Sequence, residues 1–112
     1  MQLVIAVIRP TRLDEVRAGL ASLGVGGMTV SEVLGFGRQK GQADIYRGAE
    51  YEVAFVPKVK IEVVIDDDLL ERVVECVQKA AWTGKTGDGK IFTIDVGSAT
   101  RIRTGDVDLN AL

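Results

Sequence analysis

The sequence of 112 residues contains no histidine and only one cysteine, Cys76. Without histidine the chain lacks the commonest general base and cannot form a Ser-His or Cys-His nucleophile pair. A lone cysteine excludes an intrachain disulfide, and no Cys/His cluster is available to bind zinc. Hydrolytic catalysis is therefore not expected, and the cysteine usage fits a cytoplasmic protein.

The chain also lacks an excess of positive charge. Fourteen Lys and Arg residues stand against sixteen Asp and Glu, a net charge of -2, so bulk electrostatics does not favour binding to nucleic acid or anionic lipid. The apolar run at residues 3–8 is too short to span a bilayer and has no basic segment before it. The length and the 46% of hydrophobic residues predict one domain over residues 1–112.

Four β-strands are predicted from β-branched and alternating residues, at 2–9, 28–36, 58–65 and 90–96. The first stops at Pro10, which cannot continue a hydrogen-bonded ladder. The second carries apolar residues on one side, with Glu32 as the exception, and the third alternates apolar residues with Lys and Glu. Strands of this kind suit a sheet with one face packed against helices.

Two amphipathic helices are predicted between these strands. The first begins with Thr11 as a capping residue and has a stripe of Leu13, Val16, Leu20 and Leu23. The second opens at three aspartates, 66–68, whose negative charge favours the helix N-terminus, and Gly84 can close it. Its buried stripe consists of Leu69, Leu70, Val73, Val74 and Val77.

The resulting order βαββαβ predicts an α+β, ferredoxin-like fold: an antiparallel sheet with two helices on one face. The strand at residues 2–9 is apolar on both sides, whereas the helices cover only one face of the sheet. Because an uncovered apolar sheet marks an interface, self-association through the open face is expected. Residues 38–55 show no period and are expected to form a long loop, and the polar tail after Ser98 to be weakly ordered.

Two phosphate-binding patterns fail on inspection. Gly84 and Lys85 would need a glycine at Lys79 for a P-loop, and Gly35 and Gly37 would need one at Lys40 for a dinucleotide fingerprint. The glycines at 84, 87 and 89 could still form an anion-binding nest, although such a turn is equally typical of a plain helix-to-strand connection. In an extended tail, Arg101 and Arg103 would point the same way toward a phosphate or carboxylate; the alternative is a set of solvated surface charges.

Several stretches taken together resemble the PII signal-transduction proteins, the nitrogen-status sensors of bacteria. These are GFGRQKG at 35–41, YRGAEY at 46–51, FVPKVKIE at 55–62, TGKTGDGKIF at 83–92 and RIRTG at 101–105. The resemblance runs over essentially the whole chain, with loop, turn and tail signatures in order. Arg9 departs from it, since lysine is frequent there, and Trp82 is larger than usual.

The resemblance implies a homotrimer that binds ATP or ADP in clefts between subunits, and 2-oxoglutarate with Mg²⁺ beside the ATP phosphates. Arg38 would approach the phosphates from the loop and Arg101 and Arg103 from a neighbouring subunit. Gln39 would bind Mg²⁺ and Lys58 the 2-oxoglutarate carboxylate. The remaining expected ligand residues are Gly87, Asp88, Gly89 and Lys90 at the phosphates, Gly27, Met28, Thr29, Glu62 and Val64 at adenine and ribose, and Gly37 and Thr83.

Residues 37–55 match the family's T-loop, which partner proteins read, and residues 98–112 form the C-terminal tail. Arg47 matches the residue that enters an ammonium transporter, and Tyr51 the tyrosine modified by a uridylyltransferase in proteobacterial members. The resemblance implies a cytoplasmic, non-enzymatic regulator of nitrogen metabolism that reaches the membrane only through the transporter. A small ATPase or phosphotransferase and a trimeric metal-tolerance protein remain as alternatives; the first has only Asp88 as a base in the glycine turn.

Overall fold

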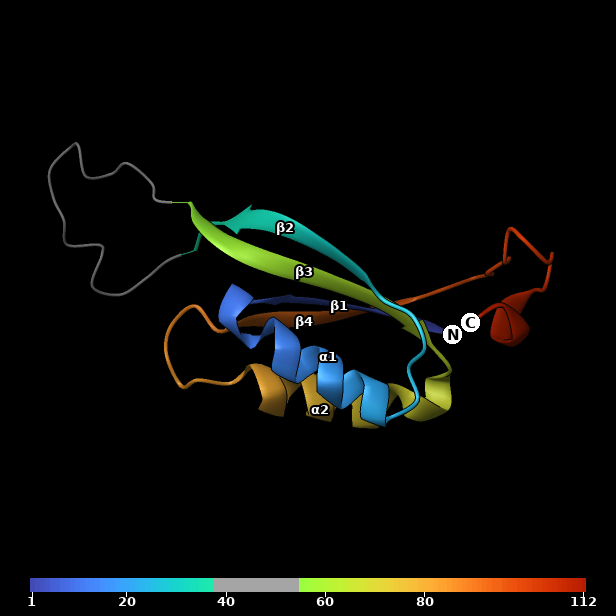
Figure 1. Cartoon of the computed structure of the whole chain (residues 1–112), viewed down its shortest axis with the longest axis horizontal. Helices are drawn as coiled ribbons and strands as arrows, with labels where there is room; N and C mark the ends of the chain where they lie inside the picture. Colours follow the sequence, from blue (N-terminus) through green and yellow to red (C-terminus); the bar gives the residue numbers. More distant parts are fainter. Residues whose placement is uncertain (38–54) are drawn as a thin grey trace, which may run out of the picture.

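The computed structural model describes residues 1–37 and 55–112. All four strands pair antiparallel, in the order β2-β3-β1-β4. Both helices lie on one face of this sheet (Figure 1), which confirms the ferredoxin-like α+β fold. In chain order the helices and strands are β1 (Gln2–Ile8), α1 (Leu13–Ser22), β2 (Thr29–Gly35), β3 (Val56–Ile65), α2 (Leu70–Ala81) and β4 (Gly89–Asp95).

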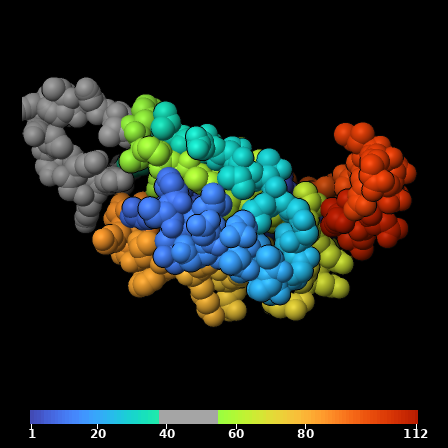
Figure 2. All heavy atoms as spheres, viewed as in Figure 1, coloured from blue at the N-terminus to red at the C-terminus, as the bar shows by residue number. Residues whose placement is uncertain are grey.

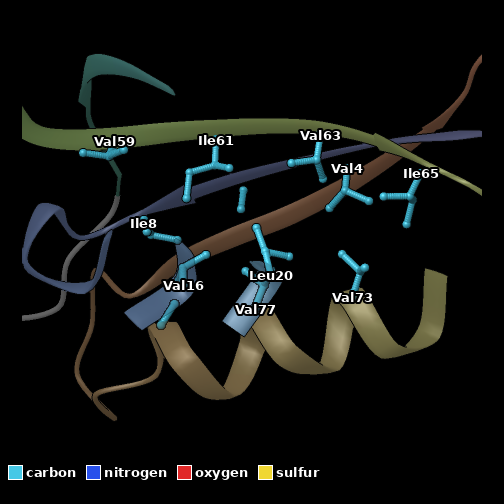
Figure 3. Close-up of a cluster of buried hydrophobic side chains, with 12 residues drawn as sticks. Val4, Ile8, Val16, Leu20, Val59, Ile61, Val63, Ile65, Val73 and Val77 are labelled. Atoms are coloured by element: carbon cyan, nitrogen blue, oxygen red, sulfur yellow. The ribbon is translucent and has the colours of Figure 1, made fainter. Parts of the chain in front are cut away.

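The hydrophobic core fills the layer between the sheet and the two helices (Figure 3). The centres of the predicted stripes are buried: Val16, Leu20 and Val73 have no exposed surface, and Val77 is 1% exposed. Val74, which was also expected in the buried stripe, is only half-buried and lies outside the core. The buried stripe residues meet alternate residues of the two central strands, as the period of two along β3 predicts. These strand residues are Val4, Ala6, Ile8, Val59, Ile61, Val63 and Ile65.

Helices α1 and α2 approach each other closely at Gly19. A Cβ atom at this position would lie 2.6 Å from the Cys76 sulfur, which is closer than atoms in contact can come. Burial between the helices raises the pKa of the Cys76 thiol. Cys76 is therefore part of the helix packing, where it behaves as a small apolar residue.

The opposite face of the sheet has no helix over it. The strand register places Leu3 and Ile5 of β1 on this face beside Ile94 and Phe92 of β4. Phe92 and Ile94 are each 50% exposed. An uncovered apolar face was expected and is confirmed, while its burial by self-association stays a prediction.

The start of the first helix differs from the expectation. Thr11 does not cap α1; it lies in a 3₁₀ helix, Pro10–Arg12, and α1 begins at Leu13 without a side-chain cap. Proline is favoured at the start of a helical turn because it has no N–H to leave unpaired. Pro10 therefore begins a 3₁₀ turn that already contains Thr11, so Thr11 cannot be the N-cap of α1.

The boundaries around β3 and α2 also differ. β3 begins at Val56, two residues before the predicted start, because it pairs with β2 beyond the last β1 partner, Val59. Gly84 does not close α2, which ends at Ala81 with Trp82 in an extended conformation. The aspartates do not open α2 directly: Asp66 accepts a hydrogen bond from the Asp68 N–H at 3.1 Å and so caps a 3₁₀ helix, Asp67–Leu69, and α2 follows from Leu70 without a side-chain cap.

The tail is folded, contrary to the weak order expected. The Asp108 N–H donates to Ala99 O at 2.7 Å and the Arg101 N–H to Asp106 O at 2.8 Å, and a 3₁₀ helix, Asp108–Ala111, follows. The Gly105 N–H donates to Arg101 O at 2.8 Å, so this segment is a closed turn. Arg101 and Arg103 thus do not lie on an extended strand, because Gly105 adopts φ 78° and turns the chain back.

Within the described residues, none of the helices combines the length and the apolar character that crossing a membrane requires.

Candidate functional site

The turn at residues 83–88, between α2 and β4, is organised by the carboxylate of Asp88. The backbone N–H groups of Thr83 and Gly84 donate to its Oδ2 at 2.7 and 2.8 Å. The Thr83 hydroxyl and, at 2.9 Å, the Arg9 Nε donate to its Oδ1. Four donors thus saturate one carboxylate, so Asp88 shapes the turn and has no oxygen to spare for a ligand cation.

Two cationic side chains from the sheet hold the far side of this turn. Arg9, just after β1, donates from Nη2 to Thr86 O at 2.7 Å. Lys58 of β3 donates from Nζ to the next carbonyl, Gly87 O. Two consecutive carbonyl groups of the turn, Thr86 O and Gly87 O, therefore each accept a hydrogen bond from a different side chain.

The glycines of the turn are required by its geometry. Gly87 has φ 103° and Gly89 has φ 106°, values that residues with a side chain rarely adopt. A Cβ on Gly89 would lie 1.7 Å from Val7 O, so only glycine allows β4 to pair with β1 here. A Cβ on Gly87 would meet Arg9 Nη2 at 3.2 Å and Lys58 Nζ at 3.5 Å, which shows how closely the two cations converge.

A cleft of about 410 Å³, here the Lys58 cleft, lies beside this turn at one end of the open face. Burial, followed by the charge of Arg9, lowers the pKa of Lys58, and the charge of Asp88 opposes this. A partly buried ammonium beside glycine backbone suits an anionic ligand. The expected ligand residues that line this cleft are Gly37, Lys58, Gly87, Gly89 and Lys90.

A second cleft of about 750 Å³, here the tail cleft, lies at the other end of the sheet. It brings together five expected ligand residues, Gly27, Met28, Thr29, Glu62 and Val64. Leu109, Ala111 and Leu112 of the tail also line it. Arg101 Nη2 donates to Leu112 O at 3.1 Å, whereas the Arg103 side chain is exposed.

Ten of the predicted ligand residues thus fall into two groups within one chain, whereas Thr83, Asp88, Arg101 and Arg103 line neither cleft. Lys58 and Val64 are six residues apart on β3, which corresponds to about 20 Å along a strand. Figure 2 shows the same separation: the orange turn and the red tail lie at opposite ends of the molecule. Arg38, Gln39, Arg47 and Tyr51 lie outside the described residues.

The structure bears on the alternative of a phosphotransfer enzyme. The hydrogen bonds from Thr83, followed by that from Arg9, hold the pKa of Asp88 well below its usual range. A carboxylate with so low a pKa is a poor base at neutral pH.

The other alternative, a metal-tolerance protein, would require a cluster of metal ligands. In residues 1–37 and 55–112, no three or more His, Cys, Asp or Glu residues gather in a way that could hold a metal ion.

The lowered pKa of Asp88 predicts how the stability of the protein changes with pH. Because its pKa is lower in the folded chain than the ordinary value of about 3.9, its contribution to stability is full above that value and is lost as the pH falls below it. Asp88→Asn should lower the thermal midpoint at pH 7, and the gap to the wild type should narrow below about pH 4. Glu75→Gln, which breaks only an exposed pair with Lys79, should change little. A gap for Asp88→Asn that is equal at all pH values would contradict the role of its charge.

Comparison with known proteins decides the family. The family model described as "Nitrogen regulatory protein P-II" matches residues 1–106. The chain belongs to the PII family. It is 57% identical to nitrogen regulatory protein GlnK of Escherichia coli K12 over 112 residues, all of both chains. It is 54% identical to nitrogen regulatory protein P-II of Bradyrhizobium diazoefficiens over the same length, and 56% identical to P-II 1 of E. coli over 108 residues, 96% of each chain.

These PII relatives are named as regulatory proteins and not as enzymes, in agreement with the expectation of a regulator.

Two parts of the site were not found from the sequence. The link between Arg9 and Asp88 joins residues 79 positions apart, and no local spacing reveals such a pair. Leu109 and Leu112 could have been noticed among the apolar residues of the tail, which also include Ile102 and Val107, although not as part of a cleft.

Proposed function

We propose that this PII protein senses nitrogen, carbon and energy status by binding ATP or ADP and, together with Mg²⁺ and ATP, 2-oxoglutarate. The observation that carries the proposal is the division of the expected ligand residues between two clefts at opposite ends of one uncovered face. The first cleft offers ammonium groups and glycine backbone, and the second is lined by glycines, apolar residues and the polar side chains of Thr29, Glu62 and Asp66. These are complementary halves of a nucleotide site.

A homotrimer joins the halves. Association through the open face buries Phe92 and Ile94 and brings the Lys58 cleft of one protomer to the tail cleft of another. Gly87, Gly89 and Lys90 then contact the phosphates, with Arg38 of the same chain and Arg101 and Arg103 of a neighbour. Thr83 and Asp88 shape the turn. Glu62 and Val64, with residues 27–29, receive the base and ribose.

The oxoacid site builds on the bound nucleotide. Gln39 supplies an oxygen to Mg²⁺ and Lys58 an ammonium to a carboxylate of 2-oxoglutarate. Because Gln39 lies at the start of the T-loop, ligand occupancy selects among loop conformations that target proteins distinguish. We expect the targets to be an ammonium transporter, reached by Arg47, nitrogen-metabolism enzymes and a sensor kinase. Tyr51 is the expected acceptor for a uridylyltransferase, and the protein is cytoplasmic except when it is bound to the transporter.

Isothermal titration calorimetry tests this function. ATP should bind with a stoichiometry of one per chain to a particle whose light-scattering mass is three times 12.0 kDa. 2-Oxoglutarate should release heat only when Mg²⁺ and ATP are both present, because its site is incomplete without them.

Two results would contradict the proposal. Equal binding of 2-oxoglutarate without nucleotide would remove the shared site. A monomer that binds ATP with full affinity would show that the two clefts do not have to meet. Sustained ATP hydrolysis at about one turnover per second or faster would instead favour the phosphotransfer enzyme.

A further inference from the structure

Glu32 is the charged residue on an otherwise apolar side of β2, and the proposed function leaves it without a role. The strand register pairs Glu32 with Val59 and Leu34 with Pro57. Val59 belongs to the core, so these side chains point to the face of the sheet that carries the helices, on the opposite side from Lys58. In the part of the chain that the structure describes, the Glu32 carboxylate forms no ion pair.

A groove of about 750 Å³, here the Leu34 groove, lies over this part of the face. Leu34 and Pro57 of the paired strands and Pro10 before α1 contribute apolar surface to it, and Glu32 contributes a carboxylate. Leu34 is 66% exposed, whereas Val59, the partner of Glu32, is 5% exposed. Figure 1 shows the reason: the helices lie below β1 and β4 in this view, and β2 is the strand farthest from them. The proposed trimer uses the other face of the sheet and leaves this groove accessible.

The lining of the groove indicates what it can bind. Its apolar residues suit an apolar side chain, whose burial would contribute most of the affinity. The carboxylate beside them favours a cation and disfavours an anion. The groove presents side chains of the sheet face and not the backbone edge of β2, which suits a helix laid on the groove better than an added strand. An amphipathic helix that carries a basic residue matches all three properties.

We propose that the Leu34 groove binds a basic amphipathic helix of a target protein, with an apolar side chain on Leu34 and Pro57 and a Lys or Arg against Glu32. The spacing agrees with this arrangement. Glu32 and Leu34 are about 7 Å apart along β2, and positions i and i+4 of a helix are about 6 Å apart. Leu34 lies three residues before Gly37, where the T-loop begins, so a target that contacts the loop also reaches the groove.

Among the expected targets, the ammonium transporter fits this chemistry best. Membrane proteins carry an excess of Lys and Arg in their cytoplasmic segments, and such segments can supply the basic helix. The proposal goes beyond the proposed function and rests on it only for this choice of target.

Two synthetic helical peptides test the groove in ¹⁵N–¹H NMR spectra of the full chain. Both carry leucine on one face; the first carries lysine on the other face and the second carries glutamate there. The lysine peptide should shift the amide signals of Glu32 and Leu34. The glutamate peptide should not shift them at the same concentration, because the Glu32 carboxylate repels it.

Variants separate the apolar contact from the charge. Leu34→Asp should lower the affinity for the lysine peptide about tenfold or more, since a buried apolar contact is lost. Glu32→Gln should lower it about threefold, as expected for an ion pair at the surface. Val30→Asp is the control for the first variant, because Val30 is 44% exposed on the same face of β2 and does not line the groove. Glu71→Gln, at an exposed position of α2, is the control for the second.

Purified transporter in nanodiscs of neutral lipid tests the choice of target. Glu32→Lys should weaken binding of the chain to the transporter about tenfold or more, because it places like charges together. Calorimetry should give wild-type ATP affinity for the same variant, since Glu32 lines neither the Lys58 cleft nor the tail cleft.

The outcomes distinguish the groove from the proposed function. Shifts of Glu32 and Leu34 with the lysine peptide, in a chain that does not bind ATP, would reject the nucleotide function and keep the groove. Equal shifts with both peptides, no shift with either, or a transporter that binds Glu32→Lys as it binds the wild type would overturn the proposal. A Leu34 signal that moves with protein concentration alone would assign the groove to a second copy of the chain. A signal that moves with anionic vesicles and not with the lysine peptide would assign it to lipid, and either result would overturn the proposal as well.

Discussion

Gly89→Ala is expected to lower the free energy of unfolding by about 3 kcal/mol, through the combined cost of a forced contact and an unfavourable backbone conformation. The new methyl group would lie 1.7 Å from Val7 O, and this oxygen belongs to β1, one of the two central strands of the sheet. Relief requires β4 to move away from β1, which breaks the pairing of Gly89 with Ile8 and changes the mouth of the Lys58 cleft. Urea denaturation at one fixed protein concentration measures the change.

Two other glycines separate the causes. Gly24 has φ 86°, but a Cβ at this position would have no neighbouring atom within 4 Å, so Gly24→Ala shows the backbone cost alone, about 1 kcal/mol. Gly97 has open space and no positive φ, so Gly97→Ala should change stability by less than about 0.5 kcal/mol. If Gly89→Ala were no more destabilising than Gly24→Ala, the close approach of Gly89 to β1 would not be a constraint.

Lys58→Met should abolish measurable 2-oxoglutarate binding, with a loss of about 30-fold or more, as expected for a hydrogen bond between charged groups. The Lys58 stem lies against Gly35, where a Cβ would be 3.0 Å from its Cγ, and methionine keeps most of this apolar stem. The effect therefore reports the ammonium group. ATP should still bind, because Lys90 and the glycine turn remain.

Lys60→Met provides the control for this experiment. Lys60 lies two residues further along β3 on the same face, between Ser31 and Val7, and it does not line the Lys58 cleft. Calorimetry with saturating Mg-ATP should give wild-type 2-oxoglutarate affinity for Lys60→Met. If Lys58→Met lost ATP as well, Lys58 would belong to the nucleotide and not to the oxoacid.

The sequence predicted the fold well where apolar residues repeat with a clear period. The alternation from Val59 to Ile65 specified which face of β3 is buried, and the spacing of Val73 and Val77 specified the face of α2. The tail was predicted wrongly because backbone hydrogen bonds build it, such as that from the Asp108 N–H to Ala99 O, and these leave no pattern of side chains. Thr11 was misread because Pro10 competes with it for the start of the turn.

The site was predictable in composition but not in arrangement. A turn rich in glycine beside Lys58 and Lys90 can be recognised from residue types, and the family resemblance named its members. Their division between two clefts depends on strand register, which local spacing does not contain. The role of Asp88 was not predictable either, because its carboxylate accepts hydrogen bonds from Thr83 and Arg9 and so stabilises the turn.

The strand order has a consequence for biosynthesis. β1 is made first, yet its neighbours are β3 and β4, and the partner of Gln2 on β4 is Asp95. A ribosome that adds roughly 5–20 residues per second leaves this strand without its second neighbour for several seconds. During that interval Val4, Ala6 and Ile8, which the finished protein buries, are open to capture by a chaperone or by another nascent chain.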